Sequence, residues 1–170
     1  MVNNTWSMDF VHDTLYSNNK RFRTLNILDE GVREVLAIEI DSSLPAARVV
    51  RVMEQLKEWR GLPNSIRCDN GPEFLATIFV DWCKQHEIEI KYIQPGKPNQ
   101  NAFIERFNRT YRDEVLNLYL FEDLDQVRDI THEWLDSYNE ERPHDALGGM
   151  TPSCYRKLLE AKSSTFELST

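Results

Sequence analysis

The segment IRCDNGPEF, residues 66–74, places an acidic residue where a short apolar strand is predicted to end. Asn70, Gly71 and Pro72 follow Asp69 directly, and these residue types are typical of a turn that leads into a helix. Asp69 therefore has two interpretations. It can cap the next helix, or its carboxylate can hold a metal ion at the end of the strand. The choice depends on which other acidic residues the fold brings near it.

Asp9 is the first candidate partner. It lies between Met8 and Phe10 in TWSMDFVH, residues 5–12, the most apolar strand that the sequence predicts. A carboxylate in a central strand is costly unless a cation or hydrogen-bond donors satisfy it. An arginine, backbone donors or a metal ion could each do so. Asp13 competes for the same role, but it lies where the strand gives way to a polar turn.

Glu105 is the second candidate partner, within the helix predicted for residues 101–117. Apolar side chains recur there every four residues and predict a buried stripe made of Phe103, Phe107, Tyr111 and Val115. Glu105, Arg109 and Arg112 fall on a different face. The structural alternative is a surface ion pair between Glu105 and Arg109, which are four residues apart.

The order of predicted elements decides whether these acids can meet. Strands at residues 5–12, 21–29 and 33–41 have connections too short for crossovers, so they form an antiparallel meander. Later elements alternate between helix and strand, which predicts right-handed crossovers that return the later strands parallel to the first. The fourth strand then lies beside the first and brings Asp69 near Asp9. These later elements are predicted at 45–59 (helix), 65–68 (strand), 72–86 (helix), 88–93 (strand), 101–117 and 123–140 (helices), and a short helix from 151.

Composition limits the function classes. The 170 residues form one domain, with residues 161–170 expected to be a disordered or loosely packed tail. Without an apolar run that could cross a membrane or a signal peptide, the chain is expected in the cytoplasm. Its three widely spaced cysteines fit reduced thiols, and Cys83 with His86 lacks the second ligand pair of a zinc site.

The net charge of −8 and the pI near 5.0 argue against a nucleic-acid partner, because phosphate binding usually requires a basic surface. Two explanations would reconcile this charge with DNA. Bound divalent cations can neutralise part of the acidity, or the main DNA-binding surface can belong to a segment outside this chain. The chain enters its first strand within about five residues, as expected of a piece of a longer protein.

Four segments together resemble the integrase-like transposases of bacterial insertion sequences, which are relatives of retroviral integrase. These segments are WSMDF, LPNSIRCDNGPEF, PGKPNQNAFIERFNRTYRDEVLN and YNEERPHDALGGMTP, and the resemblance runs from Trp6 to about Tyr155. Thirty-five residues separate Asp69 from Glu105, as in the Asp, Asp, Glu triad of that family. The resemblance implies a ribonuclease H-like α/β core over residues 1–160, a five-stranded mixed sheet flanked by helices, without the N-terminal DNA-binding region.

The resemblance also implies a mechanism. Asp9 would bridge two Mg2+ or Mn2+ ions, while Asp69 and Glu105 would each complete the shell of one ion. Carboxylates suit these cations, and two such ions support in-line displacement at phosphorus. The expected reaction is cleavage of a phosphodiester at an element end, followed by transfer of the 3′-hydroxyl strand to target DNA. The expected partners are the element ends, the target DNA and further copies of the chain, with no small-molecule cofactor.

Other residues receive roles by matched position in the family. Arg112, seven residues after Glu105, is expected to hold a phosphate near the scissile bond. His144 could approach the metal site or pack within the C-terminal region, and both interpretations stay open. Further contacts to DNA or support for the site are expected from Arg109, Lys97, Asn70, Gly71 and Asn101, the last as a helix cap.

Two other functions remain as alternatives. A structure-selective nuclease of the same fold would use the same carboxylates. A non-catalytic module would keep the fold only for protein–protein assembly, and an intact triad speaks against it.

Overall fold

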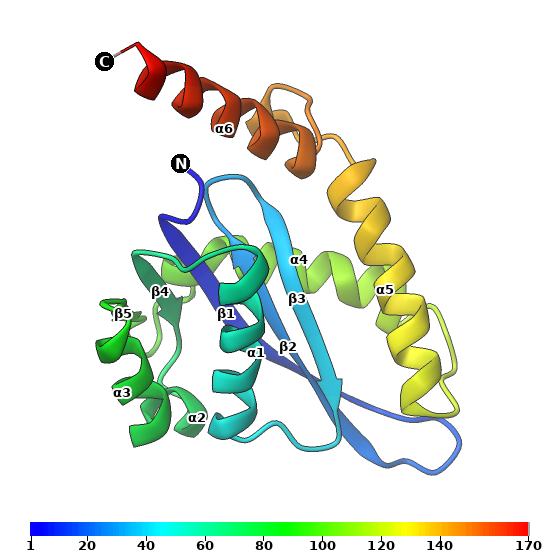
Figure 1. The fold of residues 1–170 in the computed structure, drawn as a ribbon. Helices are drawn as coiled ribbons and strands as arrows, with labels where there is room; N and C mark the ends of the chain where they lie inside the picture. Colours follow the sequence, from blue (N-terminus) through cyan, green and yellow to red (C-terminus); the bar gives the residue numbers. More distant parts are fainter. Residues whose placement is uncertain (170) are drawn as a thin grey trace.

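A five-stranded sheet lies between two layers of helices in the computed structural model, which describes residues 1–169 (Figure 1). The strands are β1 (Thr5–Thr14), β2 (Arg21–Asp29), β3 (Glu34–Asp41), β4 (Ser65–Cys68) and β5 (Glu89–Tyr92). The helices are α1 (Ala46–Trp59), α2 (Pro72–Leu75), α3 (Thr77–Gln85), α4 (Ala102–Tyr111), α5 (Leu124–Glu140) and α6 (Pro152–Leu168).

The sheet confirms the predicted topology. Its strand order is β3-β2-β1-β4-β5, with β1, β2 and β3 antiparallel and with β4 and β5 added in parallel. In the β1–β4 register, Trp6 pairs with Ile66 and Ser7 with Arg67. Two residues further along the same register, Asp9 is level with Asp69. Neighbouring strands lie about 4.8 Å apart, so the sheet itself brings these two positions together.

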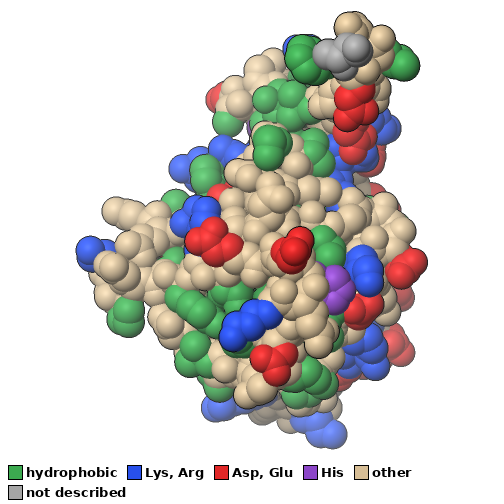
Figure 2. Space-filling view, turned by 60° about the vertical axis from the view of Figure 1, so that its left-hand side comes forward, with side chains coloured by type: hydrophobic (Ala, Val, Ile, Leu, Met, Phe, Trp, Pro, Cys, Tyr) green, Lys and Arg blue, Asp and Glu red, His purple; other side chains and the backbone are tan. Residues whose placement is uncertain are grey.

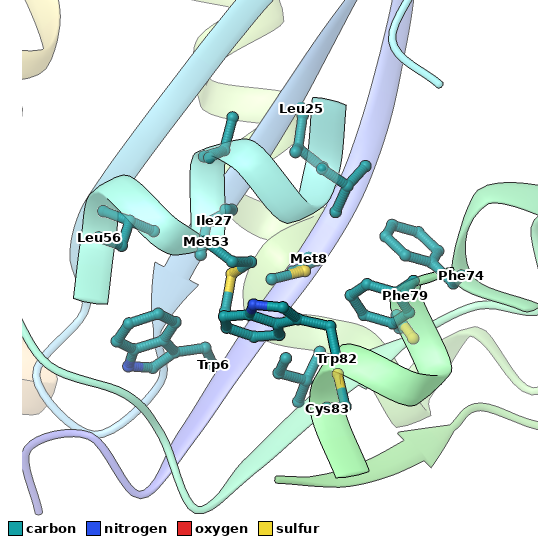
Figure 3. Close-up of a cluster of buried hydrophobic side chains, with 14 of the residues drawn as sticks. Trp6, Met8, Leu25, Ile27, Met53, Leu56, Phe74, Phe79, Trp82 and Cys83 are labelled. Atoms are coloured by element: carbon teal, nitrogen blue, oxygen red, sulfur yellow. The ribbon is translucent and has the colours of Figure 1, made fainter. Parts of the chain in front are cut away.

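Apolar side chains bury both faces of the sheet. On one face, Trp6 and Met8 of β1 pack with Met53 of α1 and with Phe79 and Trp82 of α3 (Figure 3). Trp6 and Met8 are fully buried. Complete burial of such a side chain contributes about 1.5–3 kcal/mol. β1 is therefore held firmly at the centre of the fold.

The opposite face of the sheet packs against α4 and α5. Phe107 and Tyr111 of α4 are buried there, as the helical spacing predicts. Phe103 is not part of this cluster, because its side chain is 38% exposed while Ile104 is fully buried. The predicted stripe is therefore wrong at its first position: the helix turns Ile104 toward the sheet.

Three predicted helices differ from those observed. The helix expected over residues 72–86 is broken at Ala76, whose extended backbone separates α2 from α3. The helix expected over 101–117 starts with a 3-10 turn (Pro98–Asn101) and ends with a π-helical turn (Arg112–Leu116) after α4. The last helix is not short, because α6 continues to Leu168.

α6 thus extends through residues 161–168, and the side chains after residue 160 are exposed. Residue 170 lies outside the described residues. No helix in residues 1–169 is long and apolar enough to cross a membrane.

Candidate active site

Asp9 lies at the middle of β1, on the central strand of the sheet. Its Oδ1 accepts a hydrogen bond from the backbone N–H of Phe10 at 2.9 Å, and its Oδ2 accepts one from Asn108 Nδ2 at 2.9 Å. No arginine or lysine forms an ion pair with Asp9 among the described residues. The interpretation that an arginine satisfies Asp9 is therefore wrong. Two neutral donors leave its negative charge uncompensated.

Asp69 follows the last residue of β4, where the chain turns toward α2. Its Oδ1 accepts a hydrogen bond from the backbone N–H of Gly71 at 2.8 Å. A Cβ atom at position 71 would lie only 2.9 Å from that same oxygen. Gly71 therefore supports the site by a close approach that no other residue type could make without displacing the carboxylate.

Glu105 occupies the first turn of α4 and is half-buried. The alternative role, an ion pair with Arg109, is not formed: within residues 1–169 Glu105 has no salt bridge, and Arg109 is exposed without a hydrogen bond or ion pair. The Glu105 side chain instead contributes to the electrostatic field at Asp9. The Glu105 carboxylate is therefore free to bind a ligand held at the sheet beside Asp9.

The charges of Asp69 and Glu105 make the ionised form of Asp9 less favourable. The pKa of Asp9 rises to about 6, chiefly because burial removes water from its charged form, and the charges of Asp69 and Glu105 raise it further. The hydrogen bonds from Phe10 and Asn108 act in the opposite direction. A hard divalent cation would relieve the repulsion between carboxylates clustered in this way. The donor set therefore fits Mg2+ or Mn2+.

The spacing of these donors is more open than a closed metal shell. Nowhere in residues 1–169 do three carboxylate, imidazole or thiol side chains stand close enough together to share one ion. Three carboxylates held on β1, β4 and α4 would have to move closer together to enclose a cation.

A chain of polar side chains, which the sequence did not reveal, reaches Asp9 from β2. Thr24 Oγ1 donates to Asn26 Oδ1 at 2.8 Å, and Asn26 Nδ2 donates to Asn108 Oδ1 at 2.8 Å. Asn108 Nδ2 then donates to Asp9. Thr24 and Asn26 are fully buried, and Asn26 pairs with Asp9 across β1 and β2. This chain fixes which way the Asn108 amide faces, and so keeps its donor on Asp9.

Two predicted DNA contacts are engaged within the protein. Arg112, at the start of the π-helical turn, donates to the carbonyl of His12 at 2.8 Å and lies 3.5 Å from Asp13. Asn70 donates from Nδ2 to the carbonyl of Ile93 at 2.8 Å, which ties the end of β4 to the end of β5. Arg112 would have to exchange these contacts to hold a phosphate, and Asn70 acts in this structure as a support for the turn.

Lys97 and Asn101 flank the site on the loop that leads to α4. Lys97 is exposed and lines an open cleft of about 440 Å³ together with Asp69 and Asn70. Asn101 does occupy the N-cap position, but its side chain makes no capping hydrogen bond. Its Oδ1 is buried without a partner among the described residues. The predicted capping role of Asn101 is therefore wrong in its mechanism.

His144 lies on the other side of α4, away from the carboxylates. Its ring contacts Tyr138 edge-on at 5.3 Å, and its backbone N–H donates to the carbonyl of Met150 at 3.0 Å. Of the two interpretations left open, packing in the C-terminal region is the observed one.

Comparison with known proteins identifies the family. The sequence matches the family described as Integrase core domain over residues 1–98 and again over residues 86–152. The chain belongs to the integrase core domain family. It is 45% identical over 153 residues to the 39.2 kDa protein of insertion element IS476 from Xanthomonas euvesicatoria, covering 90% of this chain and 44% of that protein.

A second insertion-element relative agrees. The chain is 40% identical over 151 residues to the 31.7 kDa protein of IS407 from Burkholderia multivorans, covering 89% of this chain and 54% of that protein. This integrase core therefore spans about half the length of the curated relatives that it matches. The predicted identification as an insertion-sequence transposase core is confirmed.

Solved integrase cores share the fold. The catalytic core domain of HTLV-2 integrase, described in complex with magnesium, superposes with a TM-score of 0.68 at 19% identity, covering 91% of this chain and 97% of that one. The catalytic core of BIV integrase gives 0.67 at 23% identity, with 96% and 99% covered. The ribonuclease H-like fold predicted from the sequence is thereby confirmed.

Proposed function

We propose that this integrase core is the catalytic domain of a DNA transposase that depends on Mg2+ or Mn2+, with Asp9, Asp69 and Glu105 as metal ligands. The observation that carries the proposal is a buried carboxylate, Asp9, whose pKa rises to about 6 chiefly because of burial and further because of the charges of Asp69 and Glu105. Clustered acids with perturbed pKa values are candidates for a functional site rather than a structural one.

The residues divide the work as follows. Asp9, Asp69 and Glu105 would hold the cations, and Asn108 keeps Asp9 oriented. Cations at this position would assist the attacking oxygen and stabilise the leaving oxygen during displacement at phosphorus. Lys97 is placed beside the cleft of Asp69 to contact a DNA phosphate.

Two successive displacements form the proposed reaction. In the first, the oxygen of water forms a bond to phosphorus at the element end, and the 3′ oxygen leaves. In the second, the oxygen of that 3′-hydroxyl forms a bond to the phosphorus of a target phosphodiester while the target's own 3′ oxygen leaves as a new 3′-hydroxyl, so that the element end is joined to the target strand. Recognition of the element ends belongs to the rest of the full-length protein, which acts as an oligomer in the bacterial cytoplasm.

Metal binding tests the ligand set without any need for activity. Calorimetry with Mn2+ should show binding by this chain that Asp69→Asn abolishes. Asp81→Asn is the matched control and should bind as wild type does. Asp81 is an exposed carboxylate on α3 whose side chain has no hydrogen bond or ion pair among the described residues. Unchanged Mn2+ binding in Asp69→Asn would refute the assignment.

Strand transfer tests the chemistry. In the full-length protein, with its element ends and Mn2+, Glu105→Gln should abolish strand transfer while DNA affinity stays nearly constant. Glu58→Gln, on the exposed side of α1, is the control that should keep activity. Cleavage without joining in the wild type would favour the nuclease alternative instead.

A further inference from the structure

A second cleft, of about 370 Å³, lies across α4 from the carboxylates. α4 contributes Phe103 and Arg106 to its wall, the turn between β2 and β3 contributes Arg33, and the segment after α5 contributes Arg142 and His144. On α4, position 103 is turned by about 160° and position 106 by about 100° from position 105, because successive residues are turned by about 100°. One helix therefore has the candidate metal ligand on one side and this cleft on the other.

The cleft gathers three arginine side chains. The Arg33 side chain donates to the backbone carbonyl of Glu30, whose carboxylate also acts on it, and the Arg106 side chain has no hydrogen bond or ion pair among the described residues. Arg142 is paired with Glu114, and Asp145 is the acidic residue of the lining. In a chain of net charge −8, neither of the guanidinium groups of Arg33 and Arg106 forms an ion pair with a carboxylate among the described residues.

One face of the molecule mixes basic, acidic and hydrophobic side chains. Figure 2 shows a face on which Lys and Arg side chains stand among acidic and hydrophobic ones, without a continuous basic field. Several other arginines form ion pairs with carboxylates, such as Arg60 with Asp29 at 2.9 Å.

Aromatic rings form the walls of the cleft and hold the guanidinium groups in place. Arg33 Cζ lies 3.9 Å from the centre of the Phe103 ring, and Arg142 Cζ lies 5.3 Å from that of Tyr138. Stacked guanidinium groups keep their N–H donors free at the edges. Phe103 is exposed and also offers an apolar surface against which a sugar or base can pack, whereas Tyr138 is buried.

His144 adds an unused polar atom. Its Nε2 is buried and has no hydrogen-bond partner among the described residues. Burial lowers the pKa of His144, and the charges of Arg142 and Arg33 lower it further, so the ring is neutral near pH 7. A neutral imidazole can donate one N–H, and an arriving anion would favour its protonation.

We infer that this cleft binds one backbone phosphate of a DNA strand, with the adjoining sugar or base against Phe103, which is exposed. Arginine forks suit phosphate oxygens, and a cleft of about 370 Å³ has room for more than a phosphate. The inference rests on the proposed function, because α4 would carry the scissile DNA on its Glu105 side. A strand that continues around the helix reaches the cleft.

Charge-removal variants test the inference in EDTA, so that metal binding takes no part. Fluorescence anisotropy with a labelled oligonucleotide should show affinity about tenfold weaker for Arg33→Gln/Arg106→Gln. The slope of log K against log salt should fall by about one, as expected for one lost phosphate contact. The control Arg51→Gln/Lys84→Gln removes two exposed charges from α1 and α3 and should change neither value. Equal losses in both variants would overturn the inference.

The ring of His144 reports where the ligand binds. On titration with oligonucleotide, its NMR signals should shift and its pKa should rise, whereas inorganic phosphate at the same phosphate concentration should have little effect. Saturation by inorganic phosphate that oligonucleotide does not displace would identify a small-anion site and overturn the DNA assignment. An unmoved His144 signal at saturating oligonucleotide would also overturn it.

Failure here can be told from failure of the proposed function. Asp69→Asn should lose Mn2+ binding but keep the His144 response, while Arg33→Gln/Arg106→Gln should keep Mn2+ binding and lose the response. Loss of Mn2+ binding in both variants would count against this inference, since it would show that the cleft variant disturbs the metal site itself.

Discussion

Asp9→Asn should stabilise the metal-free protein at neutral pH. Folding moves the pKa of Asp9 from its ordinary value of 3.8 to about 6, so the folded state holds this proton more tightly than the unfolded chain does. One pKa unit corresponds to about 1.4 kcal/mol, so the ionised carboxylate lowers the free energy of unfolding by about 3 kcal/mol above pH 6. The asparagine variant removes that cost.

The substitution also loses one hydrogen bond. Asp9 accepts from both Phe10 and Asn108, whereas asparagine has one acceptor oxygen, and Asn26 prevents the Asn108 amide from turning over. A lost hydrogen bond costs about 1 kcal/mol. The net gain at pH 7–8 is therefore about 1–2 kcal/mol.

The pH dependence gives this prediction its sign. The stabilising effect of a protonated Asp9 is fully present below pH 3.8 and is lost as pH rises through about 6. The advantage of Asp9→Asn over wild type should thus be absent near pH 4 and complete above pH 7. Urea unfolding in EDTA at several pH values measures it, with Asp81→Asn as the exposed control.

Two results would refute the reasoning. A difference between Asp9→Asn and wild type that is constant from pH 4 to pH 8 would show that Asp9 is not perturbed by folding. Added Mn2+ should reverse the order, because only wild type gains binding energy from the ion. A variant that Mn2+ stabilises as much as wild type would show that Asp9 is not a ligand.

Three further substitutions separate positioning, orientation and DNA contact. Gly71→Ala should change the free energy of unfolding by less than about 1 kcal/mol, since Gly71 has an ordinary φ of −61°, yet weaken Mn2+ binding by about tenfold or more by displacing Asp69; calorimetry and urea unfolding measure the two effects. Asn108→Ala should destabilise the protein by about 1–3 kcal/mol at pH 7–8, and by less in an Asp9→Asn background, because the lost bond is to a charged group; a double-mutant cycle that shows no coupling would contradict this. Arg112→Ala should change stability by less than about 1 kcal/mol, since its ion pair with Asp13 is long, at 3.5 Å, and partly exposed, and lower the salt slope of DNA binding by about one; an unchanged slope would leave Arg112 as a purely structural residue.

The sheet and two of its acids could be predicted because they follow from local signals. Short connections require a meander, and crossovers place β4 beside β1, so the approach of Asp69 to Asp9 follows from strand order alone. Glu105 could be placed on α4 from helical spacing, but its approach to the sheet depends on how α4 packs. The prediction that Glu105 approaches Asp9 and Asp69 therefore rests on the family resemblance and not on residue patterns.

Other features had no local signal. The break at Ala76 contains neither glycine nor proline, and the π-helical turn after Tyr111 interrupts a sequence with continuous helical periodicity. The choice between Phe103 and Ile104 as the buried residue depends on a rotation of α4 that periodicity leaves free. The contact between Asn26 and Asn108 joins positions 82 residues apart. Such contacts depend on packing, so single-sequence patterns cannot show them.

The burial of β1 explains how the fold tolerates Asp9. An uncompensated carboxylate that costs about 3 kcal/mol would unfold or distort a marginal edge strand. On β1 the same strand buries Trp6 and Met8 completely, and each contributes about 1.5–3 kcal/mol. The central strand is therefore where this cost can be offset, and the excess energy stored at Asp9 becomes available when a cation binds. Replacing Met8 by alanine should consequently make the protein's stability depend more visibly on Mn2+.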